Sequence, residues 1–134
     1  MLPKTPLAVT TIGMLAFMLA DGVWLGLMMT PFYREQMGPI ARLSNGTFAP
    51  NWPAALVVYV LLGAGLAAFV VPRAEDLASV AAQGALLGLV VYGVYDFTNL
   101  ATLRQWPLLL TLVDVAWGTA ATALCATLAW SLTR

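Results

Sequence analysis

The chain has 134 residues, of which 61% are hydrophobic and only 9% are charged, and its formal net charge is zero. Soluble chains carry about a quarter charged residues, so this composition excludes a soluble domain and indicates an integral membrane protein. The neutral balance, without any basic run, argues against nucleic acid as a partner. The length predicts a single domain over residues 1–134.

Four segments are long and apolar enough to cross a bilayer, which requires roughly 20 mostly apolar residues per helix. We predict helices over about residues 7–30, 53–71, 78–100 and 107–132. Pro31 and Pro72 should end the first two helices, and Asn51 should cap the second, with Pro53 in its first turn. The predicted fold is all-α, an integral membrane bundle of four transmembrane helices with a long loop at residues 31–52.

Four spans place both termini on one side of the membrane, which we name side A together with the turn at residues 72–77. Side B then holds the 31–52 loop and the turn at residues 101–106. The basic residues divide equally, with Lys4, Arg73 and Arg134 on side A and Arg34, Arg42 and Arg104 on side B. The positive-inside rule therefore does not orient this chain.

Small residues at helical spacing predict where helix backbones approach closely. Two pairs stand out, Gly22 with Gly26 in the first helix and Gly84 with Gly88 in the third. We expect these pairs to pack inside the bundle; the alternative is that one of them forms the interface of a homodimer.

The residue types that the chain lacks narrow its chemistry. There is no histidine and only one cysteine, Cys125, which excludes His-dependent nucleophilic catalysis, His-ligated haem and multi-thiolate zinc sites. The single lysine, Lys4, precedes the first span, so an intramembrane Schiff base is excluded too. We assign no cofactor and no resident metal. Polar chemistry must come from Asp, Arg, Tyr, Trp, Thr and Asn.

Three aspartates, Asp21, Asp96 and Asp114, fall inside predicted spans. Each costs about 2.5–3.5 kcal/mol at a helix centre on insertion scales, so each needs a reason to be there. A rise of 1.5 Å per residue places them about 13, 6 and 10 Å from the side-B helix ends, in the same half of the bilayer. We therefore expect all three to face the bundle interior at one level.

Neighbouring residues extend this polar level. Asp21 with Trp24, and Asp114 with Trp117, are three residues apart and share a helix face. The second helix contributes only Tyr59 and is expected to be scaffold. The third helix and the loop that follows the first helix contribute further residues. The predicted ligand-binding set is Asp21, Trp24, Tyr33, Arg34, Tyr92, Tyr95, Asp96, Asn99, Asp114 and Trp117. A rim arginine would pair with one of the carboxylates.

Several short blocks carry a resemblance to a known family. They are residues 21–25 (DGVWL), 32–34 (FYR), 51–55 (NWPAA), 92–102 (YGVYDFTNLAT), 106–107 (WP) and 114–118 (DVAWG). Through them nearly the whole chain resembles the small bacterial membrane proteins grouped as domain of unknown function 2177. The resemblance implies four transmembrane helices in a bacterial cytoplasmic membrane, and it implies no activity.

Three functions are compatible with the polar level. The first is binding or translocation of a small polar, cationic or lipid-like ligand in one leaflet, because intramembrane carboxylates mark ion and substrate pathways. The second is a membrane-embedded enzyme on a lipid or isoprenoid, with Asp21, Asp96 and Asp114 as candidate catalytic residues acting as acid and base or, with Asn99, as oxygen ligands of Mg²⁺ or Ca²⁺. The third is a structural or assembly subunit whose aspartates tie helices together. In each case the lipid bilayer surrounds the protein.

Overall fold

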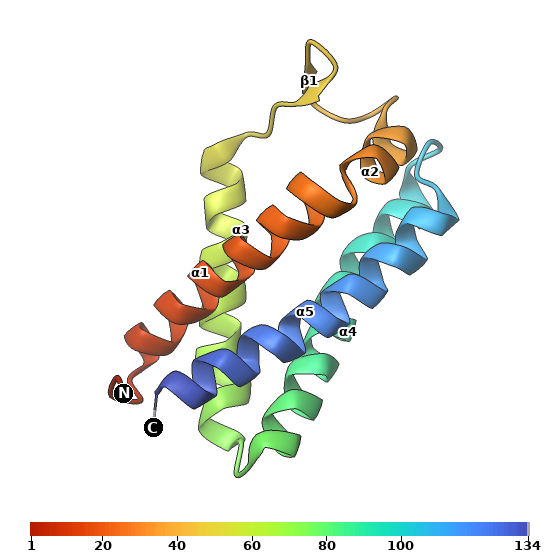
Figure 1. Ribbon diagram of the computed structural model, residues 1–134. Coiled ribbons are helices and arrows are strands. Elements are labelled where there is room, and N and C mark those ends of the chain that lie inside the picture. The colour runs from red at the N-terminus through yellow and green to blue at the C-terminus, as the bar shows by residue number, and fades with distance from the viewer. Residues whose placement is uncertain (134) are drawn as a thin grey trace.

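Four long helices alternate in direction along the chain and bring both termini to the same end (Figure 1). The computed structural model describes residues 1–133. The helices are α1 (Pro6–Val23) continued by η1 (Trp24–Met28), α3 (Trp52–Gly65) continued by η2 (Leu66–Val70) and η3 (Val71–Arg73), α4 (Leu77–Thr102), and α5 (Leu108–Leu132). All four are long and apolar enough to cross a membrane. The predicted class, an all-α membrane bundle, is confirmed.

Side-chain caps define where these helices begin. The Thr5 hydroxyl accepts a hydrogen bond from the Ala8 amide at 3.2 Å, and the Asn51 side chain accepts one from the Ala54 amide at 3.2 Å. α4 begins with a reciprocal capping box in which the Asp76 carboxylate accepts from the Ser79 amide at 2.7 Å. Such caps satisfy amides that have no partner within the helix. The predicted cap at Asn51 is therefore confirmed.

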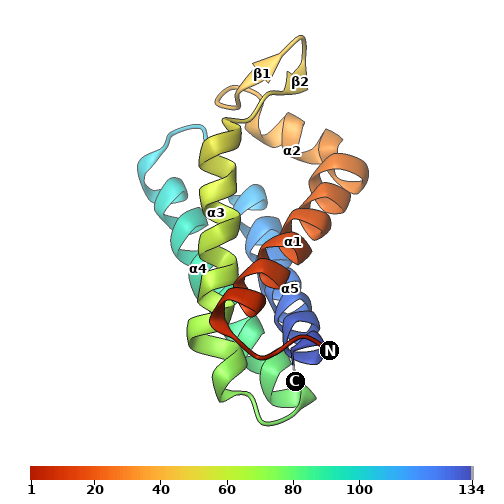
Figure 2. The same cartoon turned by 90° about the vertical axis from the view of Figure 1, so that its left-hand side faces the viewer.

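The segment predicted as a long loop contains regular structure. It holds a short helix, α2 (Thr30–Met37), and a two-stranded hairpin of β1 (Leu43–Ser44) and β2 (Thr47–Phe48), both at the side-B end (Figure 2). The first span ends at Met28, close to the predicted limit at Pro31, and Pro31 occupies the first turn of α2, where its missing amide costs nothing. The hairpin turns at Asn45 and Gly46, both with positive φ, and Asn-Gly is the sequence signal for such a turn.

Glycines set the closest helix contacts. A Cβ atom added at Gly88 would overlap the Gly118 carbonyl and the Thr122 side chain, so α4 and α5 touch backbone to backbone there. Gly63 on α3 meets the backbone of α1 in the same way. The prediction for Gly22 and Gly26 is wrong within the single chain, because nothing lies within 4 Å of a Cβ at either position.

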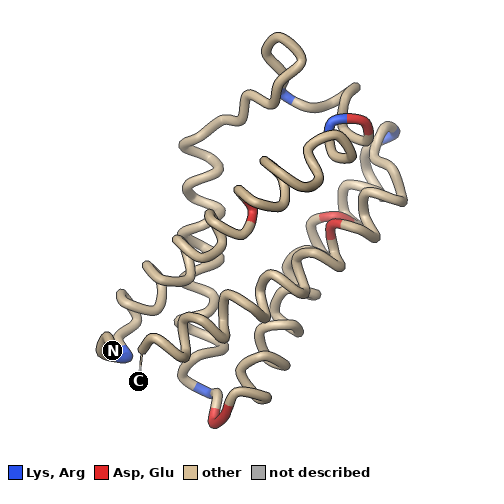
Figure 3. Tube along the Cα trace, viewed as in Figure 1, with Lys and Arg blue, Asp and Glu red and all other residues tan. Residues whose placement is uncertain are grey.

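Apolar side chains form two separate clusters along the bundle. The larger lies toward side A and includes Phe17, Leu66, Val70 and Cys125, all fully buried. The smaller lies toward side B and is formed by Tyr33, Trp106 and Leu110, with Trp24 packed against it. Charged side chains gather at both ends of the molecule, yet acidic residues also occur midway along the helices (Figure 3). These acidic residues lie where the two clusters meet.

Replacing Gly118 with alanine should destabilise the protein by about 1–3 kcal/mol, the usual cost of overpacking. The new methyl group would overlap the aromatic ring of Tyr92, which packs against the larger cluster, so the ring or the helices would have to shift. Gly22→Ala is the matched control, because its methyl group meets nothing and alanine favours helix by about 0.5–1 kcal/mol. Melting temperatures in detergent check this expectation. Equal losses in the two variants would contradict it.

Candidate functional site

Asp21 ties three helices together. Its Oδ2 accepts a hydrogen bond from the Tyr59 hydroxyl of α3 at 2.9 Å, and its Oδ1 accepts one from the Trp117 indole nitrogen of α5 at 2.9 Å. Both carboxylate oxygens of α1 are thus paired inside the bundle. The expectation that the second span is only scaffold is wrong, because Tyr59 reaches the polar level. Its signal was present in the sequence as a lone hydroxyl in the middle of an apolar segment.

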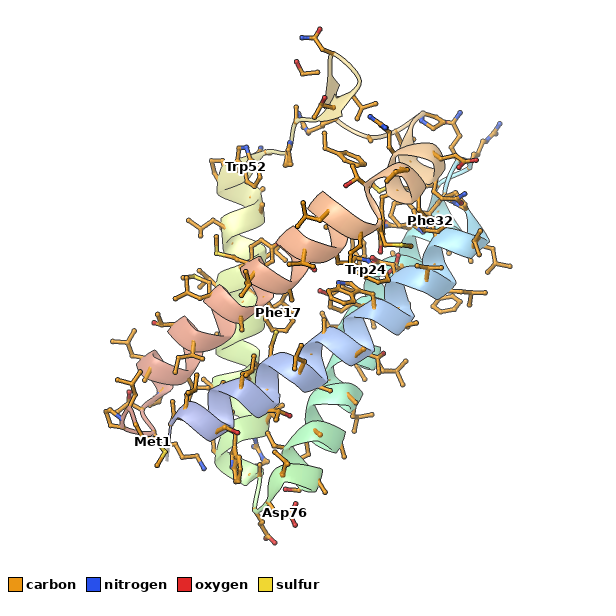
Figure 4. The ribbon with its side chains drawn as sticks, viewed as in Figure 1. Met1, Phe17, Trp24, Phe32, Trp52 and Asp76 are labelled. Carbon is orange, nitrogen blue, oxygen red and sulfur yellow. The ribbon has the colours of Figure 1, made fainter. Side chains whose placement is uncertain are left out.

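Two tryptophans stack where the hydrophobic clusters meet. The rings of Trp24 and Trp117 are parallel to within 1°, with centroids 4.4 Å apart, and Figure 4 shows the Trp24 side chain between α1 and α5. The Trp24 indole nitrogen donates to the Tyr33 hydroxyl at 3.1 Å. Each tryptophan therefore interacts with the aspartate of the other helix. Trp117 donates a hydrogen bond to Asp21 directly, and Trp24 donates to Tyr33, which in turn donates to Asp114.

Tyr33 connects this stack to a second carboxylate. Its hydroxyl donates to Asp114 Oδ1 at 2.7 Å, and the side chain is only 4% exposed. Because Tyr33 belongs to α2, a regular helix holds the phenol in place. Burial, and then the charge of Asp114, raise the pKa of the Tyr33 phenol above its usual range, so the hydroxyl stays protonated and remains a donor.

Asp96 is the exception among the three aspartates. It is fully buried, with 0% exposure, and neither of its carboxylate oxygens has a hydrogen-bond donor. The group that it meets is the carboxyl of Asp114 on the neighbouring helix. Asp96 lies six residues before the end of α4 and Asp114 six residues after the start of α5, so both lie about 9 Å from the side-B helix ends. A buried carboxylate without donors costs several kcal/mol, which sets this position apart from the rest of the bundle.

The other predicted residues of α4 lie beside the carboxylates without contributing a hydrogen bond to them. The Tyr92 ring packs directly over Gly118. Tyr95 is 54% exposed and meets Trp106 edge to face, with centroids 5.8 Å apart. Asn99 interacts with the Tyr95 hydroxyl one turn away. These residues frame the polar level from the α4 side.

Arg34 does not pair with a carboxylate, contrary to the expectation for a rim arginine. It is exposed, and its guanidinium donates to the Gly46 carbonyl at 3.0 Å, which joins α2 to the hairpin. The acceptor lies in the Asn45–Gly46 turn, which was not predicted although its sequence signal is present.

The described residues include no group of three or more His, Cys, Asp or Glu side chains that could hold a metal ion. The three aspartates therefore do not form a metal-binding group. Cavities of about 370 and 280 Å³ lie elsewhere, and neither is lined by any of the three aspartates. The first is near Lys4 and Pro72, and the second is between η2 and α4 around Gln83.

Replacing Trp117 with phenylalanine should destabilise the protein by about 1–3 kcal/mol, since Asp21 Oδ1 would lose its donor inside the bundle. The matched control is Trp52→Phe, because Trp52 is 70% exposed at the start of α3 (Figure 4). Thermal unfolding followed by intrinsic fluorescence measures both variants. A loss for Trp52→Phe as large as that for Trp117→Phe would contradict the assigned role.

Comparison with known proteins gives one finding. The family described as "Predicted membrane protein (DUF2177)" matches residues 7–131, nearly the whole chain. No curated protein and no solved structure matches the chain. The match includes nearly every residue of the four spans and all the residues that hydrogen-bond to Asp21 and Asp114. The chain therefore belongs to the DUF2177 family of predicted membrane proteins and is an integral multi-pass membrane protein.

Proposed function

We propose that this protein binds a small cation at the Asp96–Asp114 carboxyl pair, in the half of the membrane nearer side B. We place it in a bacterial cytoplasmic membrane, as the resemblance of residues 92–102 implies. The observation that carries the proposal is Asp96, a fully buried carboxyl group whose two oxygens have no donor. Ionisable groups inside membranes are retained where ions or substrates are handled.

The hydrogen-bond pattern supports a cation over a neutral or anionic ligand. Donors reach Asp21 and Asp114 from Tyr59, Trp117 and Tyr33, and each of these donors is already engaged. What the pair lacks is positive charge or a donor, because Asp96 faces a second carboxyl instead of an N–H or O–H group. A bound cation supplies what is missing.

The aromatic side chains support a small ligand over a bulky one. An organic cation held by aromatic residues needs an open ring face within about 6 Å. Trp24 and Trp117 cover one face of each other at a centroid separation of 4.4 Å. The polar network also ends at this level, and the cluster toward side A is apolar. These features favour binding from side B over passage through a single chain.

A structural role is the second candidate, and Asp21 favours it. Both oxygens of Asp21 are paired with donors from two other helices, as expected of a carboxylate that ties helices together. The two roles divide between the aspartates: Asp21 holds the bundle, and the Asp96–Asp114 pair binds the ligand.

The proposal predicts that cations stabilise the protein through this pair. Melting temperatures would be measured in nanodiscs while Na⁺, K⁺, methylammonium and pH are varied separately. We expect at least one of these cations, the proton included, to raise the melting temperature of the wild type, and we expect Asp96→Asn and Asp114→Asn to remove that dependence. Asn at position 96 should fold, because its amide can donate to Asp114.

Glu75→Gln is the matched control, since Glu75 is exposed in the side-A turn and its loss removes the same charge. This variant should keep the full cation dependence. Cation binding would be refuted if no cation changed the melting temperature of the wild type, or if Asp96→Asn and Asp114→Asn responded to cations as the wild type does. The structural role would then be the remaining candidate.

A further inference from the structure

The carboxyl groups of Asp96 and Asp114 are in contact, and Asp96 has no hydrogen-bond donor that would offset the repulsion between their negative charges. Asp114 Oδ1 already accepts the hydrogen bond of Tyr33 at 2.7 Å, and Asp96 receives no donor at all. Two carboxylates cannot hydrogen-bond to each other, because both are acceptors only. When one of them carries a proton, it becomes a donor to the other, and the contact turns from repulsive to attractive.

The number of available ligands determines which cation suits this site. Ca²⁺ takes six to eight oxygen ligands and Mg²⁺ needs an octahedral set. The described residues provide no group of three acidic side chains here, and the Asp96 oxygens are buried away from water. A proton needs only two oxygens and no cavity.

We propose that the cation bound by the Asp96–Asp114 pair is a single exchangeable proton; this inference rests on the proposed function and names its ligand. On loading, a hydronium ion from side B gives up one proton, an O–H bond forms on a carboxyl oxygen of the pair, and water is released. The charge of the pair changes from −2 to −1. On release, that O–H bond breaks and the proton returns to water on side B. Asp114, which is only half-buried, is the member through which the proton enters.

The titratable groups that interact with the pair come from several elements. They are Asp21 on α1, Tyr33 on α2, and Tyr92 and Tyr95 on α4. No arginine or lysine of the described chain is among them, so no fixed positive charge competes with the proton for the pair. Tyr33 is a positioning residue, because its hydrogen bond occupies Asp114 Oδ1.

Infrared difference spectroscopy detects the proposed proton directly, because a protonated carboxyl group has its own C=O stretching band. We expect the wild type in nanodiscs to show this band at neutral pH, to lose it as the pH rises, and to shift it in D₂O. The band should be absent in Asp96→Asn and in Asp114→Asn. It should remain in Glu75→Gln, which removes an exposed carboxyl group far from the pair.

Two further variants keep the experiment decisive if an amide variant does not fold. Asp114→Glu retains two carboxyl groups and moves one by a methylene, so the band should remain with a changed frequency. Tyr33→Phe removes the donor to Asp114, and the band should persist to a pH about one unit higher, a tenfold change in proton affinity. A purely structural tyrosine would not move that midpoint.

Several outcomes would overturn the inference. The first is the absence of the carboxylic acid band from the wild type at neutral pH. The second is a band that remains unchanged in both Asp96→Asn and Asp114→Asn. The third is a band whose frequency is the same in Asp114→Glu as in the wild type. Stabilisation by Na⁺, K⁺ or methylammonium that depends on Asp96, with no carboxylic acid band, would refute the proton and keep the proposed cation site. Loss of both the band and every cation dependence would refute the two proposals together.

Discussion

The stacking of Trp24 on Trp117 joins the two halves of the molecule. Trp117 packs on the cluster toward side A, and Trp24 packs on the smaller cluster toward side B. Stacked aromatic pairs contribute about 0.5–1.5 kcal/mol beyond the area that they bury. The larger consequence is geometric. With the two rings parallel, one indole nitrogen reaches Asp21 and the other reaches Tyr33, so a single contact fixes the partners of two carboxylates.

A bilayer offers no water to polar groups in its core, so each of them must find a partner in the protein. This bundle meets that requirement with two hydrogen-bonded groups, one around Asp21 and one around Asp114, which are joined by the stacked tryptophans. Asp96 departs from the rule, with two buried oxygens and no donor. Positions where an otherwise consistent structure breaks a local rule are expected to serve function. That is why the proposed function rests on Asp96 and not on the better paired Asp21.

Close backbone contact makes the Asp96–Asp114 pair possible. Gly84 and Gly88 on α4, with Gly118 on α5, allow these two helices to approach until a Cβ at any of the three would overlap the facing helix. Helices in membranes pack through such small residues because no hydrophobic force draws them together. The close packing at these glycines thus holds Asp96 and Asp114 in contact, although two ionised carboxyl groups repel each other.

The class of the protein and the limits of its helices can be predicted from residue patterns alone. Composition and four long apolar segments required a membrane bundle, and the helix limits follow from caps and prolines that act within a turn, such as Asn51 and Pro53. Counting residues also placed the aspartates at one level, since the rise of a helix is constant. The sequence held local signals for two features that were missed, the Asn45–Gly46 turn and the lone hydroxyl of Tyr59.

The pairing of the polar groups depends on how the helices pack against one another. Spacing put Asp21 with Trp24 and Asp114 with Trp117 on shared faces, but each tryptophan serves the other aspartate because helix crossing, not helix period, sets that distance. The same reason gives Asp21 its donors from α3 and α5 and leaves Gly22 without a neighbour. Arg34 bonds to a hairpin instead of a carboxylate, since its acceptor depends on a turn twelve residues away. Hydrogen bonds between helices depend on a fraction of an ångström of packing, which no pattern along one helix encodes.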